Sequence, residues 1–203
     1  MSKQKLVTRK DLYLGSVLLF GGAIIWQLIL PPPPASASPL AVHIAVFLGT
    51  LFAFVSYGVL YLLTDKCKLL RGVLARDLRG FAEVAKKLSY REVIVIALLA
   101  GFGEELLFRV FLQGWAVSLV GPMIGVALAS LLFGLVHPVS IFYITFTSLL
   151  GLLFGSAYHL TGSYVLVAVW HFVYDLFAIA ALKMRPGFYK NLTKVSTVKG
   201  MKN

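Results

Sequence analysis

Long stretches without charged residues dominate this chain. Residues 12–30 and 40–63 contain no Asp, Glu, Lys or Arg, and Asp175 is the only such residue between Arg109 and Lys183. A helix that crosses the hydrocarbon core of a bilayer needs about 20 mainly apolar residues. Hydrophobic residues make up 59% of the chain and charged residues 13%, whereas soluble domains carry roughly 25% charged residues. The sequence therefore predicts a membrane protein and excludes a soluble enzyme, a disordered chain and a disulfide-linked secreted module.

Gly, Pro and polar residues divide the apolar sequence into segments of membrane-spanning character. We expect six spans, at residues 12–30, 40–63, 93–120, 122–137, 139–159 and 163–182. The third is unusually long, and Gly101 and Gly103 are expected to break it. The segment PPPPASASP at 31–39 predicts a helix stop followed by an extended linker. The predicted fold is all-α, a polytopic bundle of transmembrane helices that forms a single membrane domain over residues 1–203.

Basic residues are grouped beside the apolar segments. Of the 19 Lys and Arg, four lie in residues 1–11, eight in 65–92 and six in 183–203. Basic flanks mark the cytoplasmic side of a membrane, so we expect both termini in the cytoplasm. The net charge of +11 is explained by these flanks, and no nucleic-acid partner is predicted. The bilayer of a prokaryotic plasma membrane is the expected location.

Residues 66–91 combine basic side chains with apolar ones at helical spacing. The apolar face is expected to hold Leu70, Leu74, Phe81, Ala85 and Leu88. This pattern predicts one amphipathic helix that lies at the inner membrane surface.

The N-terminal segment allows a second interpretation. Its basic start, its apolar run and the sequence Ala35-Ser36-Ala37 are also features of a signal peptide with a cleavage site. The apolar run is long for a signal peptide, and prolines precede the cleavage site. We therefore expect residues 1–37 to be retained, with their apolar part as the first span.

Ionisable residues at membrane depth are concentrated between positions 100 and 175. Such residues cost a few kcal/mol or more in a bilayer and usually mark function. On a helix, Glu105 and Arg109 share one face and form a favourable i,i+4 pair. Glu104 points about 100° away from its neighbour, so it has no local cation and suits proton abstraction. The alternative is a buried ion triad of Glu104, Glu105 and Arg109 that serves helix packing alone.

Two histidines with partners follow on later spans. Phe133-x-x-x-His137 ends the predicted fourth span, and His171-x-x-x-Asp175 lies on one face of the sixth. Imidazoles orient a water or donate to an oxyanion, and a carboxylate takes the proton of the water. His137 is expected near the cytoplasmic end of its span, whereas Glu104 lies about 20 Å from the inner end of its helix. Tilt or a shifted boundary must therefore bring them together.

In this order, Glu104-Glu105-x-x-x-Arg109, Phe133-x-x-x-His137 and His171-x-x-x-Asp175 resemble the motifs of the CPBP family. These are the CAAX-processing and bacteriocin-processing intramembrane endopeptidases, also called the abortive-infection family. The resemblance covers roughly residues 90–180. It implies a glutamate-type intramembrane protease whose partners are membrane-anchored protein or peptide substrates. CAAX proteins, bacteriocin or pheromone precursors and C-terminal sorting signals are all family possibilities.

The resemblance also implies a role for each residue. Glu104 would be the general base that activates water together with His137. His171 and the residue at position 175 would stabilise the oxyanion. The family commonly has Asn where this chain has Asp175, and an ionised Asp cannot donate a hydrogen bond. Asp175 must therefore either stay protonated or orient His171 by accepting its N–H, and we expect the second role. Supporting roles would fall to Glu105, Arg109 and Phe133.

A metal site is the main mechanistic alternative. Two His and one Glu form a known catalytic zinc set, and its ligands here would be Glu104, His137 and His171. The sequence has no His-Glu-x-x-His pattern, and we favour chemistry without a metal or other cofactor. Two further alternatives are a non-catalytic membrane factor and a proton-coupled transporter. The short chain and the missing internal repeat argue against transport.

Overall fold

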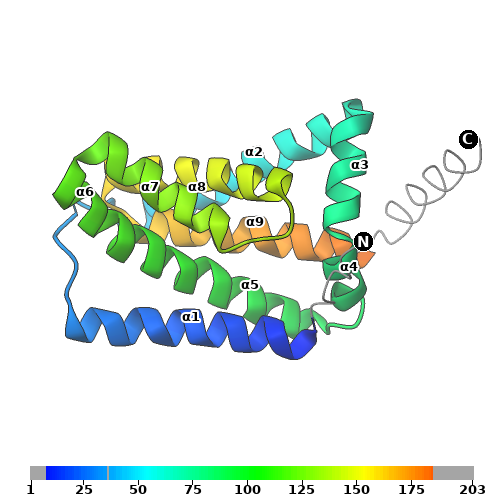
Figure 1. Cartoon of the computed structure of the whole chain (residues 1–203), viewed down its shortest axis with the longest axis horizontal. Coiled ribbons are helices and arrows are strands. Elements are labelled where there is room, and N and C mark those ends of the chain that lie inside the picture. The colour runs from blue at the N-terminus through cyan, green and yellow to red at the C-terminus, as the bar shows by residue number, and fades with distance from the viewer. Residues whose placement is uncertain (1–7, 36, 185–203) are drawn as a thin grey trace, which may run out of the picture.

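The computed structural model describes residues 8–35 and 37–184, and within them every regular element is a helix. The long helices are α1 (Arg9–Ile29), α2 (Val42–Lys66), α5 (Tyr90–Glu105), α7 (Pro122–Leu135), α8 (Ile141–Thr161) and α9 (Tyr164–Met184). The shorter elements are α3 (Lys68–Asp77), α4 (Arg79–Ala85), the π-helix η1 (Leu106–Gln113) and α6 (Gly114–Val120). Figure 1 shows the long helices side by side, with α3 lying across one end of the bundle. The expected all-α class is confirmed.

Within the described residues, three helices are long and apolar enough to cross a membrane: α2, α8 and α9. The other three predicted segments coincide with α1, with the continuous run of α5, η1 and α6, and with α7, which has only 14 residues. The expected break at Gly101 and Gly103 is wrong, because α5 passes through both. The irregularity comes later, where the helix widens into η1.

The single amphipathic helix predicted for residues 66–91 is also wrong. Leu78 separates α3 from α4, and Ser89 caps a new helix, α5, through a capping box with Glu92. The predicted apolar face is turned largely inward, with Ala85 packed near Leu182 of α9. Leu74, Ala85 and Leu88 are all buried. These apolar residues therefore contribute to the protein core.

Glycines hold α9 close to two other helices. A Cβ added to Gly49 of α2 would lie 2.5 Å from the carbonyl oxygen of Leu166 in α9. A Cβ added to Gly101 of α5 would lie 2.5 Å from the backbone nitrogen of Phe172. Small residues let helix backbones approach closely in membrane proteins. The close approach at Gly101 fixes the distance between the α5 carboxylates and the polar residues of α9.

Candidate active site

A row of buried polar side chains, joined by hydrogen bonds, runs along η1. Glu105, Arg109 and Gln113 lie one turn apart and are at most 1% exposed. Arg109 donates from Nε to Oε2 of Glu105 at 2.9 Å and from Nη1 to Oε1 of Gln113 at 3.4 Å. Gln113 in turn donates to the carbonyl oxygen of Gly155 in α8 at 2.8 Å. The structure thus brings Glu105 and Arg109 together as their spacing predicts, and it adds Gln113, which the same i,i+4 spacing could have identified.

The side chain of Glu104 points away from this row of polar side chains. Its Oε2 is buried without a hydrogen-bond partner among the described residues and lies 3.7 Å from Nε2 of His137. His137 follows the C-terminal end of α7, where its Nδ1 is 2.7 Å from the carbonyl oxygen of Phe133. A carbonyl only accepts, so Nδ1 carries the proton and Nε2 is the atom that faces Glu104. The two residues meet because α7 is short and ends at the depth of Glu104.

His171 connects α9 to α5. Its Nδ1 lies 2.9 Å from Oε1 of Glu105, and its Nε2 lies 3.5 Å from Oδ2 of Asp175. The ring stacks on Phe154 with centroids 5.2 Å apart. The sequence suggested that Asp175 orients this ring. Asp175 does face Nε2 of the ring, and the packing of α5 against α9 adds a second, shorter contact from Glu105 to Nδ1.

Phe133 occupies the centre of the cluster. Its ring centroid lies 5.1 Å from the guanidinium carbon of Arg109. It also lies 5.0 Å from the ring of His137 and 5.8 Å from that of His171. Phe133 is 3% exposed, so this side chain packs the guanidinium of Arg109 and both histidine rings around one buried aromatic ring.

A cavity of about 520 Å³ opens beside these residues. Its polar part is lined by Glu104, His137, His171, Asp175 and Tyr143. Its remaining walls are mainly apolar and come from α2, α3, α4, α8 and α9. The cavity therefore offers polar groups at one place and an apolar surface for the rest of a bound chain.

The zinc set expected as an alternative would consist of Glu104, His137 and His171. Among residues 8–35 and 37–184, no three His, Cys, Asp or Glu side chains are grouped so that they could hold a metal ion. Both ring nitrogens of His171 already face carboxylates, Glu105 on one side and Asp175 on the other. A metal shared with Glu104 and His137 would compete with Asp175 for Nε2, whereas a hydrogen bond from Nδ1 to Glu105 is compatible with metal binding at Nε2.

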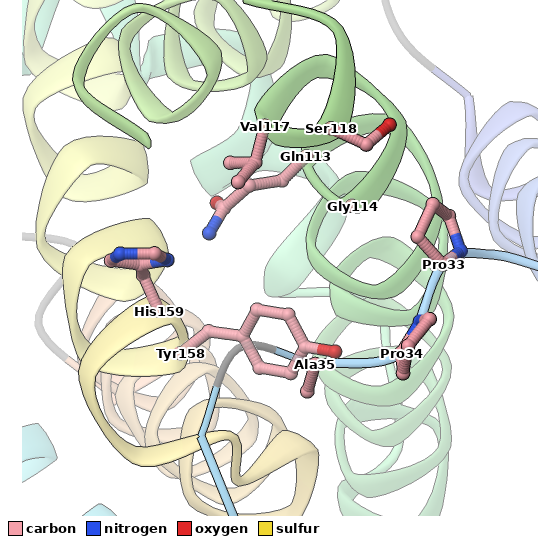
Figure 2. Close-up of a pocket in the computed structure, with 9 residues that line it drawn as sticks. All are labelled: Pro33, Pro34, Ala35, Gln113, Gly114, Val117, Ser118, Tyr158 and His159. Atoms are coloured by element: carbon pink, nitrogen blue, oxygen red, sulfur yellow. The ribbon is translucent and has the colours of Figure 1, made fainter. Parts of the chain in front are cut away.

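A smaller cavity, of about 170 Å³, lies under the proline linker. Figure 2 shows Gln113 on one wall, Tyr158 and His159 on the opposite wall, and Pro33, Pro34 and Ala35 of the linker beside them. Gln113 thus borders this cavity at one end of the row of polar side chains, and Glu105 contacts His171 at the other end. Neither Gln113 nor Tyr143 was singled out in the sequence.

Residues 87–177 match the family described as Type II CAAX prenyl endopeptidase Rce1-like. The matched range contains Glu104, Glu105, His137, His171 and Asp175, and it leaves α1, α2, α3 and α4 outside. The resemblance to CAAX-processing endopeptidases is thereby confirmed for this part of the chain. Neither the comparison with curated proteins nor that with solved structures gives a match.

Proposed function

We propose that this protein is an intramembrane endopeptidase that cleaves membrane-anchored protein or peptide substrates, with CAAX-type substrates as the first candidate. The matched family is a protease family. One observation carries the proposal: Glu104 has a buried, unpartnered carboxylate oxygen among the described residues, and that oxygen faces Nε2 of His137 at the wall of a large cavity. A carboxylate of this kind contributes little to packing and is well placed to act on a water molecule.

In the proposed reaction, Glu104 and His137 orient the attacking water. Both facing atoms accept hydrogen bonds, so a water that donates to both turns a lone pair toward a substrate carbonyl. Attack forms the new carbon–oxygen bond, and the π electrons of the carbonyl move to its oxygen. The water proton passes to Glu104. Glu104 then returns the proton to the amide nitrogen as the carbon–nitrogen bond breaks, which gives a carboxylic acid and an amine.

His171 is the proposed donor to the developing oxyanion. Glu105 accepts the hydrogen of Nδ1, so Nε2 donates when the ring is an imidazolium. Glu105 and Asp175 flank the ring and compensate its positive charge. Donors fixed in advance around a developing negative charge are among the largest contributors to catalysis. Arg109 completes the arrangement because it balances the charge of Glu105.

We place the site in a membrane domain of six spans. In this arrangement α1 and the run of α5, η1 and α6 cross the bilayer together with the three longer apolar helices, and α7 is a shorter span that ends within it. The end with α3 and α4 faces the cytoplasm, as the basic residues around 65–92 favour, and these two helices lie at the inner surface. The proposed location is a prokaryotic plasma membrane.

The test is cleavage of a fluorogenic, farnesylated CAAX peptide by the purified full chain in proteoliposomes. Glu104→Gln is expected to abolish turnover while the protein stays folded. Glu83→Gln, on the exposed face of α4, is the matched control and should cleave at the wild-type rate. Each protein is assayed with and without a chelator.

The outcomes separate the alternatives. Inhibition by chelator and recovery with zinc would replace the proposed mechanism by a metal-dependent one. Equal activity of wild type and Glu104→Gln would contradict the protease proposal and favour a non-catalytic membrane factor. A bacteriocin-precursor peptide assayed in parallel distinguishes between the substrate classes.

A further inference from the structure

The proposed site lacks a donor at position 175. An ionised Asp175 only accepts hydrogen bonds, and its Oδ2 is turned toward His171 at 3.5 Å. An oxyanion in this part of the cavity would therefore receive one hydrogen bond from His171 and none from Asp175. A tetrahedral intermediate is stabilised best by more than one donor fixed in advance. Another group on the cavity wall must complete the set.

Tyr143 is a hydroxyl-bearing residue on the same polar wall. It lines the cavity together with Glu104, His137 and Asp175. Asp175 and Glu104 are the two carboxylates with the largest electrostatic effect on its phenol. Because Tyr143 comes from α8 and Asp175 from α9, a carbonyl bound between these helices could be reached from both sides.

The first turn of α8 holds Tyr143 in place. The backbone nitrogen of Tyr143 donates to Oγ of Ser140 at 3.0 Å, so Ser140 caps the helix. Ser140 donates in turn to Oδ2 of Asp77 at the end of α3. The carboxylate of Asp77 is 2% exposed and is paired with Arg76 at 3.0 Å. A helix outside the family-matched range thus fixes the start of α8.

The hydroxyl of Tyr143 is available to a ligand. Within the described residues it makes no hydrogen bond to the protein, whereas two aromatic residues of α9 do use their polar atoms. Tyr164 donates to the carbonyl oxygen of Phe102 at 2.7 Å, and Trp170 donates to Ser56 at 3.0 Å. A tyrosine with a free O–H on a polar cavity wall is well suited to bind a substrate oxygen.

We propose that Tyr143 donates its phenolic hydrogen to the carbonyl oxygen of the scissile peptide bond, and so serves as the second oxyanion donor in place of an amide at position 175. This inference rests on the proposed protease function. The water forms the new carbon–oxygen bond, its proton passes to Glu104, and the carbonyl π electrons become the oxyanion. Tyr143 keeps its proton throughout and contributes a hydrogen bond only.

The test combines Tyr143→Phe with Asp175→Asn in the proteoliposome assay with the farnesylated CAAX peptide. Tyr143→Phe should lower kcat by about 10²–10³-fold, the usual effect of losing one oxyanion donor. KM and the unfolding temperature should stay near wild type, because the hydroxyl has no protein partner. When Asp175→Asn is added to Tyr143→Phe, kcat should be at least tenfold higher than for Tyr143→Phe alone, since the amide supplies a donor. Tyr90→Phe, at the exposed start of α5 and outside the cavity lining, is the control and should retain the wild-type rate.

Two results would overturn the inference. One is a wild-type rate for Tyr143→Phe. The other is a loss that Asp175→Asn does not relieve and that comes with a lowered unfolding temperature, since this indicates a structural role. Glu104→Gln keeps the two proposals distinguishable. If it is inactive while Tyr143→Phe is fully active, only the role of Tyr143 fails; if wild type and Glu104→Gln do not differ, both fail.

Discussion

Oε1 of Glu105 lies 2.9 Å from Nδ1 of His171, although the two residues are 66 positions apart. The other carboxylate oxygen accepts a hydrogen bond from Arg109, also at 2.9 Å. Glu105 therefore links a cation on its own helical run to an imidazole on α9. The two adjacent glutamates have different surroundings: Glu105 holds the site together, and Glu104 faces the cavity.

Glu105→Gln is expected to destabilise the protein, whereas Glu104→Gln is not. Removing one partner of a buried ion pair costs about 3–5 kcal/mol, because the other charge stays buried and uncompensated. Here Arg109 would be left at 0% exposure without a carboxylate. Thermal unfolding of both variants in detergent measures the difference. Equal unfolding temperatures would contradict the division of roles between the two glutamates.

Gly101→Ala should disturb the site from a distance. Its Cβ would lie 2.5 Å from backbone atoms of Phe172 in α9, and overpacking of this kind costs about 1–3 kcal/mol. The shift of α9 relative to α5 should lengthen the contact between Glu105 and His171, so cleavage of the CAAX peptide should fall together with stability. Gly58→Ala in α2 is the control, because its Cβ meets nothing within 4 Å. A Gly101→Ala variant as stable and active as the control would disprove this account.

Substitutions of Ser140, which caps α8, and of Asp77 in α3 should have coupled effects. Ser140→Ala removes an N-cap and should cost about 1 kcal/mol of stability. Asp77→Asn weakens the same contact from α3. Since Ser140 and Asp77 act through one hydrogen bond, the double variant should lose less stability and activity than the sum of the two single changes. Thr145→Ala, an exposed position on α8, should behave as wild type, and strict additivity would show that α3 does not support α8.

The single cysteine provides a test of orientation. Cys67 is exposed and lies between α2 and α3. In intact cells it should be protected from a membrane-impermeant maleimide, whereas in inverted vesicles it should react, because the proposed orientation, which the basic flanks favour, puts this end in the cytoplasm. Ser118→Cys combined with Cys67→Ser places the thiol near the opposite end and should give the reverse pattern. Labelling of Cys67 in intact cells would show the opposite topology.

Sequence patterns located the helices well and the contacts between helices poorly. Apolar runs predicted every long helix, because the length and hydropathy of a segment are local properties. The pair of Glu105 and Arg109 was equally accessible, since both lie on one helical run. The link from Glu105 to His171 depends on how α5 packs against α9, which no local pattern encodes.

The errors have similar causes. Periodicity over residues 66–91 does not register the turn at Leu78, so two helices were read as one. The segment predicted at 122–137 nearly coincides with α7, but its local pattern does not show that His137 faces Glu104 of α5. Tyr143 carries no charge and was not distinguished from the many aromatic residues of the apolar segments.

The short length of α7 also determines which chains can reach the site. A helix of 14 residues is about 21 Å long, whereas the hydrocarbon core of a bilayer is about 30 Å thick. In the proposed orientation, the turn that carries His137 lies below the surface of the membrane. A peptide bond reaches that level only when its chain is already anchored in lipid. Depth would then act as a filter that spares soluble cytoplasmic proteins, without any need to recognise their sequences.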